Sequence, residues 1–360
     1  MSNLRTPLYD WHVAHKGRMV PFGGWDMPVQ YSSILTEHLA VRNRCGWFDI
    51  SHMARIMLKG PDAEALIQLI WTGDASALAP GRVRYGLVCN EQGGILDDIL
   101  VTRFPDEWLL VVNASNRQKI LAWLQFHAEG KSVTITDHTL EWAMIAVQGP
   151  TASLHVPSWM NEFSRMKYYT AAVTTGSDGP EIISRTGYTG EDGFEYIASP
   201  AKVLALIERL SSGDNPVVPC GLGCRDTLRL EAAMPLYGHE LNESIDPITA
   251  GLAWAVKLQK PDFVGKAALV AKLADSARLH RVGLELEGRR AAREGARVLQ
   301  NGVEIGSVTS GSFAPTLEKS IAMAYVPSSA ADLGTSVDVD IRGTITPAKV
   351  VALPFYQRGR

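Results

Sequence analysis

The sequence predicts a multidomain α+β protein that ends in a domain built only of strands. Its 360 residues are more than one hydrophobic core usually organises. Hydrophobic residues make up 46% and charged residues 20% of the chain, which is the balance of a folded globular protein. Helix-like and strand-like patterns alternate up to about residue 277, whereas only short strand-like patterns follow. These observations indicate α+β domains followed by an all-β domain.

The clearest succession of elements lies between residues 54 and 139. Strands are expected over Ala54–Lys59, Val83–Cys89, Ile95–Phe104, Glu107–Asn113 and Val133–Asp137, and helices over Ala63–Trp71 and Asn116–Glu129. Pro61 stands at a tolerated first-turn position of the first helix. In the second helix, Ile120, Leu124 and Phe126 are among the expected apolar positions. The pattern predicts helices that cover one face of an antiparallel sheet.

Residues 140–270 repeat this pattern more faintly. Strands are expected over Met144–Val147, Ala172–Thr175, Glu181–Arg185 and Gly193–Ala198, and a helix over Ala201–Leu210. The Gly149-Pro150 boundary resembles the earlier Gly60-Pro61 boundary. A Gly-Pro helix start is common, so this similarity only suggests an internal duplication.

The last eighty or so residues carry no helical pattern. Strands are expected over Val282–Leu286, Arg297–Gln300, Val303–Thr309, Ser320–Val326, Ser336–Ile341 and Thr346–Val351. Asn301-Gly302 is a strong hairpin signal. The sequence therefore predicts a small barrel or jelly roll, joined to the rest by a helix over Lys266–Ala277.

Charge and cysteine usage narrow the function classes. The formal net charge of −3 is too near neutral for non-specific binding to nucleic-acid phosphates. The N-terminus has no secretory signal, and no apolar run is long enough to span a bilayer. Cys220 and Cys224 lack a second ligand pair for a metal, so the four cysteines are expected to be reduced thiols. We expect a cytoplasmic protein without a metal and without a nucleic-acid or membrane partner.

Two carboxylates begin an otherwise apolar strand. Asp97 and Asp98 follow the turn at Gly93-Gly94. Neighbouring strand residues point to opposite faces, so one carboxylate is expected to face the interior. A buried carboxylate is costly unless partnered, and is typically retained for hydrogen bonding or proton transfer. From the pattern alone, the pair could equally well end the turn.

Residues 185–195 form a second unusual stretch. Its glycines, Gly187, Gly190 and Gly193, would let the backbone approach a ligand closely. Tyr188 offers a flat face for stacking, and Glu195 offers a recognition carboxylate. The alternative is a glycine-rich hairpin tip with a solvated glutamate.

Residues 219–231 form a third unusual stretch. Glycine-rich backbone leads into a helix there, whose N-terminus could receive an anion, and Arg225 could reach a ligand. His12, His15 and His52 have no identifiable third metal ligand, so hydrogen-bonded histidines are favoured.

Eight motifs follow one another through almost the whole chain. They are Thr6–Tyr9, Met19–Pro28, Glu37–Arg42, Gly46–Met53, Gly94–Asp98, Thr186–Glu191, Gly221–Glu231 and Thr309–Leu317. By these motifs the sequence resembles the aminomethyltransferases, the T-protein family of the glycine cleavage system. Two departures from the family pattern, Trp47 and Cys224, remove no chemical role.

The resemblance implies a three-domain cloverleaf around a central folate pocket. The first domain would be discontinuous, over residues 1–53 and 140–270, the second an α+β domain over 54–139, and the third a jelly-roll-like barrel over 280–360. It implies transfer of the methylene carbon from the aminomethyl-lipoyl arm of a transiently bound H-protein to tetrahydrofolate. Ammonia and 5,10-methylenetetrahydrofolate would be the products. Tetrahydrofolate would be the co-substrate, and no metal or nucleotide would be needed.

The resemblance also implies roles for single residues. Asp97 would be the catalytic carboxylate, which orients the amine and accepts a proton beside the folate nitrogens. Glu195 would recognise the pterin through its N–H donors, and Arg225 would also bind folate. The remaining pocket candidates are Tyr85, Asn113, Tyr168, Tyr188 and Tyr356.

Two relatives of the family offer alternative functions for this chain, because a fold does not by itself determine a function. A folate-binding iron–sulfur assembly factor would lack the Asp97-Asp98 pair and would carry a Lys-Gly-Cys-Tyr type motif in place of Arg185–Tyr188. A folate-dependent demethylase is the other alternative. Oxidases of that kind need an additional flavin domain, for which this chain has no room.

Overall fold

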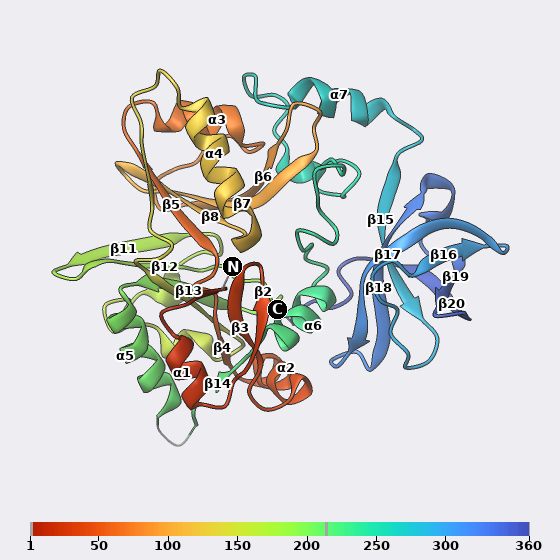
Figure 1. The fold of residues 1–360 in the computed structure, drawn as a ribbon, viewed down its shortest axis with the longest axis horizontal. Helices are drawn as coiled ribbons and strands as arrows, with labels where there is room; N and C mark the ends of the chain where they lie inside the picture. Colours follow the sequence, from red (N-terminus) through yellow and green to blue (C-terminus); the bar gives the residue numbers. More distant parts are fainter. Residues whose placement is uncertain (1–2, 213–214, 360) are drawn as a thin grey trace. The chain divides into compact units, whose positions relative to one another are not determined.

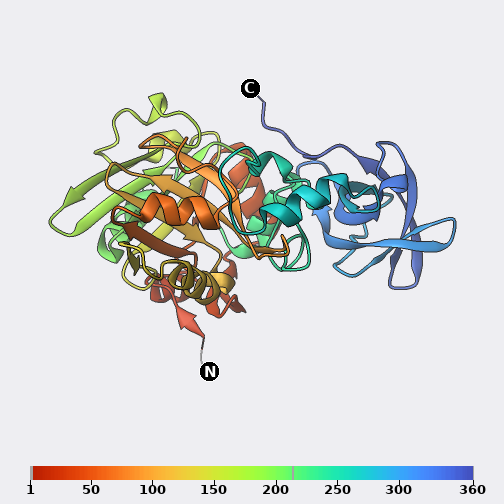
Figure 2. The ribbon, with the colours of Figure 1, turned by 90° about the horizontal axis from the view of Figure 1, so that it is seen from above.

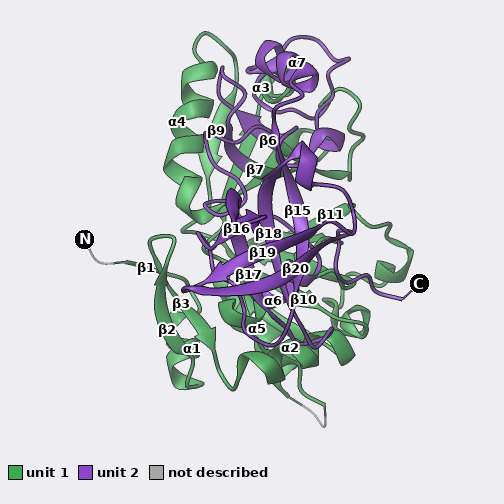
Figure 3. Cartoon of the chain, turned by 90° about the vertical axis from the view of Figure 1, so that its right-hand side faces the viewer, with its two compact units in different colours: residues 1–68, 74–86, 98–225 green, residues 69–73, 87–97, 226–360 purple. Residues whose placement is uncertain are grey.

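The computed structural model describes residues 3–212 and 215–359 and divides into two compact units. The first unit comprises residues 1–68, 74–86 and 98–225, and the second comprises residues 69–73, 87–97 and 226–360 (Figure 3). Helices and antiparallel sheets are mixed, which confirms the predicted α+β class. The three-domain division stays a prediction, and its outer limits at residues 1 and 360 lie outside the described residues. None of the helices in the described stretches is long and apolar enough to cross a membrane.

A six-stranded sheet forms the centre of the first unit. Its order is β11 (Ala171–Gly176), β12 (Gly179–Ser184), β13 (Gly193–Ala198), β10 (Ala143–Gln148), β4 (Gly46–Asp49) and β14 (Val218–Pro219). Helix α5 (Pro200–Ser211) buries Val203, Leu206, Ile207 and Leu210, which share one helical face. These residues join strand residues such as Trp47, Ile145 and Phe194 in one hydrophobic core. The predicted strands and helix of residues 140–270 are therefore confirmed, with shifted ends.

A small sheet near the N-terminus was not anticipated from the sequence. It has the order β1 (Leu4–Arg5), β3 (Trp25–Gln30) and β2 (Arg18–Phe22). Helix α1 (Tyr9–Ala14) lies between β1 and β2, and helix α2 (Ile34–Asn43) follows β3. The segment shows no clean alternation of apolar and polar residues, and prolines stand within both longer strands.

A five-stranded sheet contains the elements expected between residues 54 and 139. Its order is β6 (Val83–Cys89), β7 (Ile95–Arg103), β8 (Glu107–Val112), β5 (Ala54–Lys59) and β9 (Thr134–Asp137), and helices α3 (Ala63–Ile70) and α4 (Arg117–His127) follow β5 and β8 along the chain. The prediction for Phe126 was wrong, because its side chain is 68% exposed. Ile120 and Leu124 form the buried stripe of α4, and Phe126 lies about 200° from Leu124 around the helix.

The C-terminal domain is a closed barrel, as predicted. Its six strands follow the order β15 (Leu279–Leu286), β18 (Lys319–Pro327), β17 (Val303–Ala314), β16 (Arg297–Gln300), β19 (Ser336–Ile341) and β20 (Thr344–Val351), all coloured blue in Figures 1 and 2. Asn301 and Gly302 both have positive φ, of 53° and 77°, which is the geometry of a tight hairpin turn. Helix α7 (Lys266–Ala274) precedes the barrel and is shorter than predicted.

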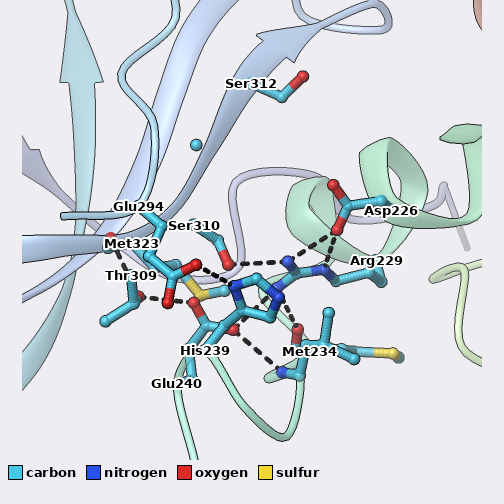
Figure 4. A network of polar contacts seen from close by, with 12 residues as sticks. Asp226, Arg229, Met234, His239, Glu240, Glu294, Thr309, Ser310, Ser312 and Met323 are labelled. Carbon is cyan, nitrogen blue, oxygen red and sulfur yellow. Dashed lines mark hydrogen bonds and ion pairs between the residues drawn. The ribbon is translucent and has the colours of Figure 1, made fainter. Parts of the chain in front are cut away.

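Within the second unit, a buried ionic network joins Arg229, near the end of helix α6 (Leu222–Glu231), to the barrel (Figure 4). The Arg229 guanidinium donates to Glu240 Oε2 at 2.9 Å and to Ser310 Oγ at 2.8 Å, and the Thr309 hydroxyl donates to Glu240 Oε1 at 2.6 Å. Burial by itself would raise the pKa of Glu240, but the charge of Arg229 and the hydroxyl donors hold this pKa below its usual value. The network gives a structural reason for the Thr309-Ser310 motif.

Replacing Arg229 with methionine is expected to lower the free energy of unfolding by about 3–5 kcal/mol, because it leaves Glu240 buried without its counter-charge. Urea unfolding of the two proteins measures the difference. The matched control is Arg297→Met, which breaks the exposed ion pair with Asp340 in the same barrel and should leave the unfolding midpoint nearly unchanged. Equal midpoints for the wild type and Arg229→Met would contradict the importance of the network.

Candidate functional site

Glu195 is a buried carboxylate on the non-core face of the six-stranded sheet. Its neighbours on β13, Phe194 and Tyr196, belong to the hydrophobic core, so Glu195 points to the opposite face. It stands between Ala146 on β10 and Ser184 on β12, which both have small side chains. Only 7% of Glu195 is exposed, so most of this residue is shielded from water.

One oxygen of Glu195 is already bonded. The Thr186 hydroxyl donates to Glu195 Oε2 at 2.5 Å, whereas no described residue donates to Oε1. Burial raises the pKa of Glu195, and the hydrogen bond from Thr186 and the charge of Arg225 oppose this rise. The site therefore offers an acceptor oxygen to a ligand that carries N–H donors.

Arg225 and Tyr188 lie together beside this carboxylate. The Arg225 guanidinium carbon is 4.7 Å from the centre of the Tyr188 ring, a cation–π arrangement. Burial lowers the pKa of Arg225, and its interactions with Tyr188 and Glu195 act in the other direction. The structure thus brings together three residues that were predicted to bind folate. We call Glu195, Thr186, Arg225 and Tyr188 the Glu195 cluster.

Two of the glycines of residues 185–195, Gly187 and Gly193, are explained by close packing within the chain. A side chain at Gly187 would lie 1.9 Å from Gln148 Oε1, and one at Gly193 would lie 2.3 Å from the Val147 carbonyl oxygen. Gln148 Nε2 donates to the Thr186 carbonyl at 3.1 Å. The loop is closed by a bidentate ion pair between Arg185 and Asp192. A rigid loop therefore presents Tyr188.

Asp98 holds a second group of predicted residues. The Tyr85 hydroxyl donates to Asp98 Oδ2 at 3.1 Å, and Asn113 Nδ2 donates to Asp98 Oδ1 at 2.7 Å. All three side chains are half-buried. We call Asp98, Tyr85 and Asn113 the Asp98 cluster. A carboxylate fixed through both oxygens and still accessible is suited to receive a proton from a bound amine.

Asp97 lies on the opposite face of β7. It is 0% exposed, whereas Asp98 is partly accessible, so the expectation that one carboxylate of the pair faces the interior is confirmed. The preceding turn is set by Gly93, at φ +81°, and by Gly94, where a side chain would lie 1.8 Å from the Glu243 carbonyl oxygen. The geometry favours Asp98 over Asp97 as the carboxylate that a ligand can touch.

Two adjacent tyrosines, Tyr168 and Tyr169, pack against each other in the first unit. The Tyr168 and Tyr169 rings pack edge to face at 5.0 Å. Val83, two residues before Tyr85, donates its N–H to the Tyr169 carbonyl at 3.0 Å. Burial raises the pKa of Tyr169, and the charges of Tyr168 and Glu195 add to the rise. Tyr168 thus packs on a tyrosine that senses the charge of Glu195, whereas Tyr356 lies in the second unit, where its N–H donates to the Glu231 carbonyl.

The N-terminus of α6 already has an anionic partner. The Gly221 N–H donates to Glu37 Oε2 at 2.9 Å, so the anion at this helix start is a carboxylate of the chain itself. A side chain at Gly221 would lie 2.3 Å from the backbone of Val29, which explains the glycine. The anion site predicted for a ligand at this helix start is therefore not supported.

The histidines mostly serve internal hydrogen bonds. His12 Nε2 and Asp49 Oδ2 are 2.9 Å apart, and the Tyr31 hydroxyl lies 2.7 Å from His12 Nδ1. His52 differs, because its buried Nδ1 has no hydrogen-bond partner among the described residues. Burial lowers the pKa of His52 to about 3, so this imidazole is neutral near pH 7. Within residues 3–212 and 215–359, no three His, Cys, Asp or Glu side chains could together hold a metal ion.

Comparison with family models agrees with these features over most of the chain. The model described as "GCVT N-terminal domain" matches residues 8–260. The model described as "Glycine cleavage T-protein C-terminal barrel domain" matches residues 280–357, which include the closed barrel.

Curated relatives and a solved structure match the full length. An aminomethyltransferase of Moorella thermoacetica is 47% identical, with 99% of each chain covered. An aminomethyltransferase of Symbiobacterium thermophilum is 46% identical, covering 99% of this chain and 98% of the relative. The crystal structure of glycine cleavage system aminomethyltransferase T from Bartonella henselae is similar with a TM-score of 0.92 and 37% identity, covering 99% of each chain.

Proposed function

The chain belongs to the glycine cleavage T-protein family of aminomethyltransferases, and from this premise we propose that it transfers a methylene carbon to tetrahydrofolate. The carbon would come from an aminomethyl group bound through sulfur to the lipoyl arm of H-protein. The carbon–sulfur and carbon–nitrogen bonds break, and two bonds form to N5 and N10 of the folate. The dihydrolipoyl arm, ammonia and 5,10-methylenetetrahydrofolate are the products.

The Glu195 cluster is the observation that carries the proposal. The aminopyrimidinone edge of a pterin presents adjacent N–H donors, which suit a carboxylate acceptor. Glu195 supplies that acceptor, with Oε2 fixed by Thr186 and Oε1 open to a donor. Tyr188 and Arg225 add a flat face and a cation beside it. Such a combination favours a planar heterocycle with N–H donors over a nucleotide phosphate.

We assign the proton chemistry to the Asp98 cluster. Tyr85 and Asn113 orient the Asp98 carboxylate, so it can accept the proton that a folate nitrogen loses as the new bond forms to carbon. Its negative charge also stabilises positive charge that develops on the transferred carbon. The sequence-based assignment to Asp97 stays a prediction, and variants at both positions distinguish the two carboxylates.

The remaining co-substrate and partner assignments follow from the chemistry. The carbon keeps its oxidation state during the transfer, so the reaction requires neither a nicotinamide nor another nucleotide. H-protein would bind transiently, because its arm must leave after each turnover. Tyr168 and Tyr356 are the further folate contacts that we propose. The cytoplasmic location and the absence of a nucleic-acid partner stay predictions, and no observation favours the iron–sulfur or demethylase alternatives.

Folate binding can be tested without the partner protein. Isothermal titration with 5-methyltetrahydrofolate, a reduced folate that cannot accept the carbon at N5, should give saturable binding. Loss of this binding in Arg225→Met, but not in the surface variant Arg289→Met, would support the site. If both variants still bind 5-methyltetrahydrofolate, the folate site does not depend on Arg225 and must lie outside the Glu195 cluster.

A further inference from the structure

Helix α2 has an unusual orientation in the first unit. Its buried side chains include Glu37, His38 and Arg42, while Leu35 and Leu39 are 53% and 37% exposed. A surface helix normally buries its apolar stripe and exposes its charges. Burying charged groups is unfavourable unless they are paired and hydrogen-bonded. The inward charges of α2 therefore require partners. Those partners lie at the start of α6, which carries Arg225, and in the loop that carries Tyr188.

Glu37 binds the start of α6. Its Oε1 accepts the N–H groups of Tyr31 at 2.7 Å and Ser32 at 2.9 Å, and its Oε2 accepts the Gly221 N–H at 2.9 Å. The Arg225 N–H donates to the Gly221 carbonyl at 3.2 Å, one helical turn later. Glu37 thus fixes the peptide on which the first turn of α6, and with it Arg225, is built.

Arg42 binds the loop that carries Tyr188. Its Nη1 donates to the Thr189 carbonyl at 2.7 Å and to Glu191 Oε1 at 2.9 Å. Both side chains of this ion pair are almost fully buried, at 3% and 4% exposure. Thr189 directly follows Tyr188, so Arg42 restrains the backbone next to the stacking ring.

We propose that α2 is a positioning element for folate binding: Glu37 and Arg42 hold Arg225 and Tyr188 in the relative position that receives the pterin. Both residues would act without touching the ligand: Glu37 through backbone N–H groups, and Arg42 through the Thr189 carbonyl and the Glu191 carboxylate. The identity of the ligand rests on the proposed function, whereas the positioning itself does not. Arg225 and Tyr188 come from distant parts of the sequence, and one rigid helix reaches both.

Glu37→Gln separates positioning from mere folding. An amide has one acceptor oxygen and one donor group, whereas a carboxylate has two acceptor oxygens. The amide oxygen should stay with the two N–H groups of Tyr31 and Ser32, which turns the amide N–H₂ toward the Gly221 N–H, donor against donor. The substitution therefore disturbs one contact selectively, at the start of α6. The affinity for 5-methyltetrahydrofolate should fall about tenfold, as for partial loss of a charge-assisted hydrogen bond.

The kinetic signature follows from where the disturbance lies. The KM for tetrahydrofolate should rise about tenfold, while kcat at saturating folate should stay within about twofold, because the Asp98 cluster is untouched. Amide hydrogen exchange in residues 221–225 should become faster in the variant. The control is Asp49→Asn, which weakens another fully buried carboxylate of the first unit and should lower the melting temperature without changing folate affinity. Arg42→Lys repeats the test at the other contact if Glu37→Gln does not fold.

The outcomes distinguish this inference from the proposed function. Wild-type folate affinity and wild-type exchange of residues 221–225 in Glu37→Gln would overturn the positioning role. Equal losses of affinity in Glu37→Gln and Asp49→Asn would also overturn it, because general destabilisation would then explain both. A wild type that binds no reduced folate, while exchange in Glu37→Gln still accelerates, would refute the ligand and support the positioning role.

Discussion

Replacing Asp98 with asparagine is expected to lower kcat for carbon transfer by about 10²–10⁴-fold, the usual contribution of a positioned general base. Asparagine keeps the shape of the side chain and can accept from Asn113 at its oxygen while its N–H₂ donates to the Tyr85 hydroxyl, but it cannot take up a proton. Folate affinity should change little, because we propose that the Glu195 cluster recognises the pterin. Single-turnover ammonia release at saturating tetrahydrofolate measures the effect.

Asp97→Asn is the matched control for this prediction. Asp97 is fully buried, so its replacement should reduce the free energy of unfolding more than it reduces kcat. The reverse pattern, an inactive but folded Asp97→Asn beside an active Asp98→Asn, would restore the assignment made from the sequence. Two active variants would move the proton chemistry to another residue.

Replacing Glu195 with glutamine is expected to weaken folate binding by about 10–100-fold, the loss of a charge-assisted hydrogen bond in a buried site. The amide can present its oxygen to Thr186 or to the ligand, but not to both. Titration with 5-methyltetrahydrofolate measures the affinity. Glu181→Gln is the control, because Glu181 lies on the adjacent strand β12 and its carboxylate bonds Trp159, Tyr196 and Lys202 instead of the Glu195 cluster. Equal affinities of the wild type and Glu195→Gln would exclude Glu195 from the site.

The buried carboxylate of Glu195 predicts that folate binding depends on pH. Burial raises the pKa of Glu195, so this carboxylate takes up a proton at a higher pH than an ordinary glutamate. The binding-competent ionised form is present above the raised pKa and is lost as the pH falls through it. Wild-type folate affinity should therefore fall on acidification while that of Glu195→Gln stays nearly constant. Parallel pH profiles of the two proteins would contradict this assignment.

Elements with a clean periodic pattern could be predicted from the sequence. The barrel strands follow turns such as Asn301-Gly302, and β13 was predicted with its observed limits, Gly193–Ala198. The N-terminal sheet could not be predicted in this way, because its strands contain Pro21 and Pro28 and have mixed burial. Helix α2 could not be predicted from an amphipathic pattern either, because several of its charged side chains face inward.

The candidate site was only partly accessible to sequence reasoning. The resemblance identified Glu195, Arg225 and Tyr188, and the structure brings these three together. Which carboxylate of the Asp97-Asp98 pair faces outward depends on neighbouring strands, and strand alternation alone leaves it open. The supports Glu37, Arg42 and Gln148 were not predicted, because their partners are backbone groups far away in the sequence. Glu37 and Arg42 are buried charges in a short helix, and buried charges of this kind usually have partners elsewhere in the fold.

The central claim is carbon transfer to tetrahydrofolate, and ammonia release tests it most directly. Purified protein would be mixed with H-protein that carries the aminomethyl-lipoyl group, with and without tetrahydrofolate. We expect rapid ammonia release that requires tetrahydrofolate and is accompanied by stoichiometric 5,10-methylenetetrahydrofolate. A folded protein that binds reduced folate but releases no ammonia above the rate without enzyme would contradict the account.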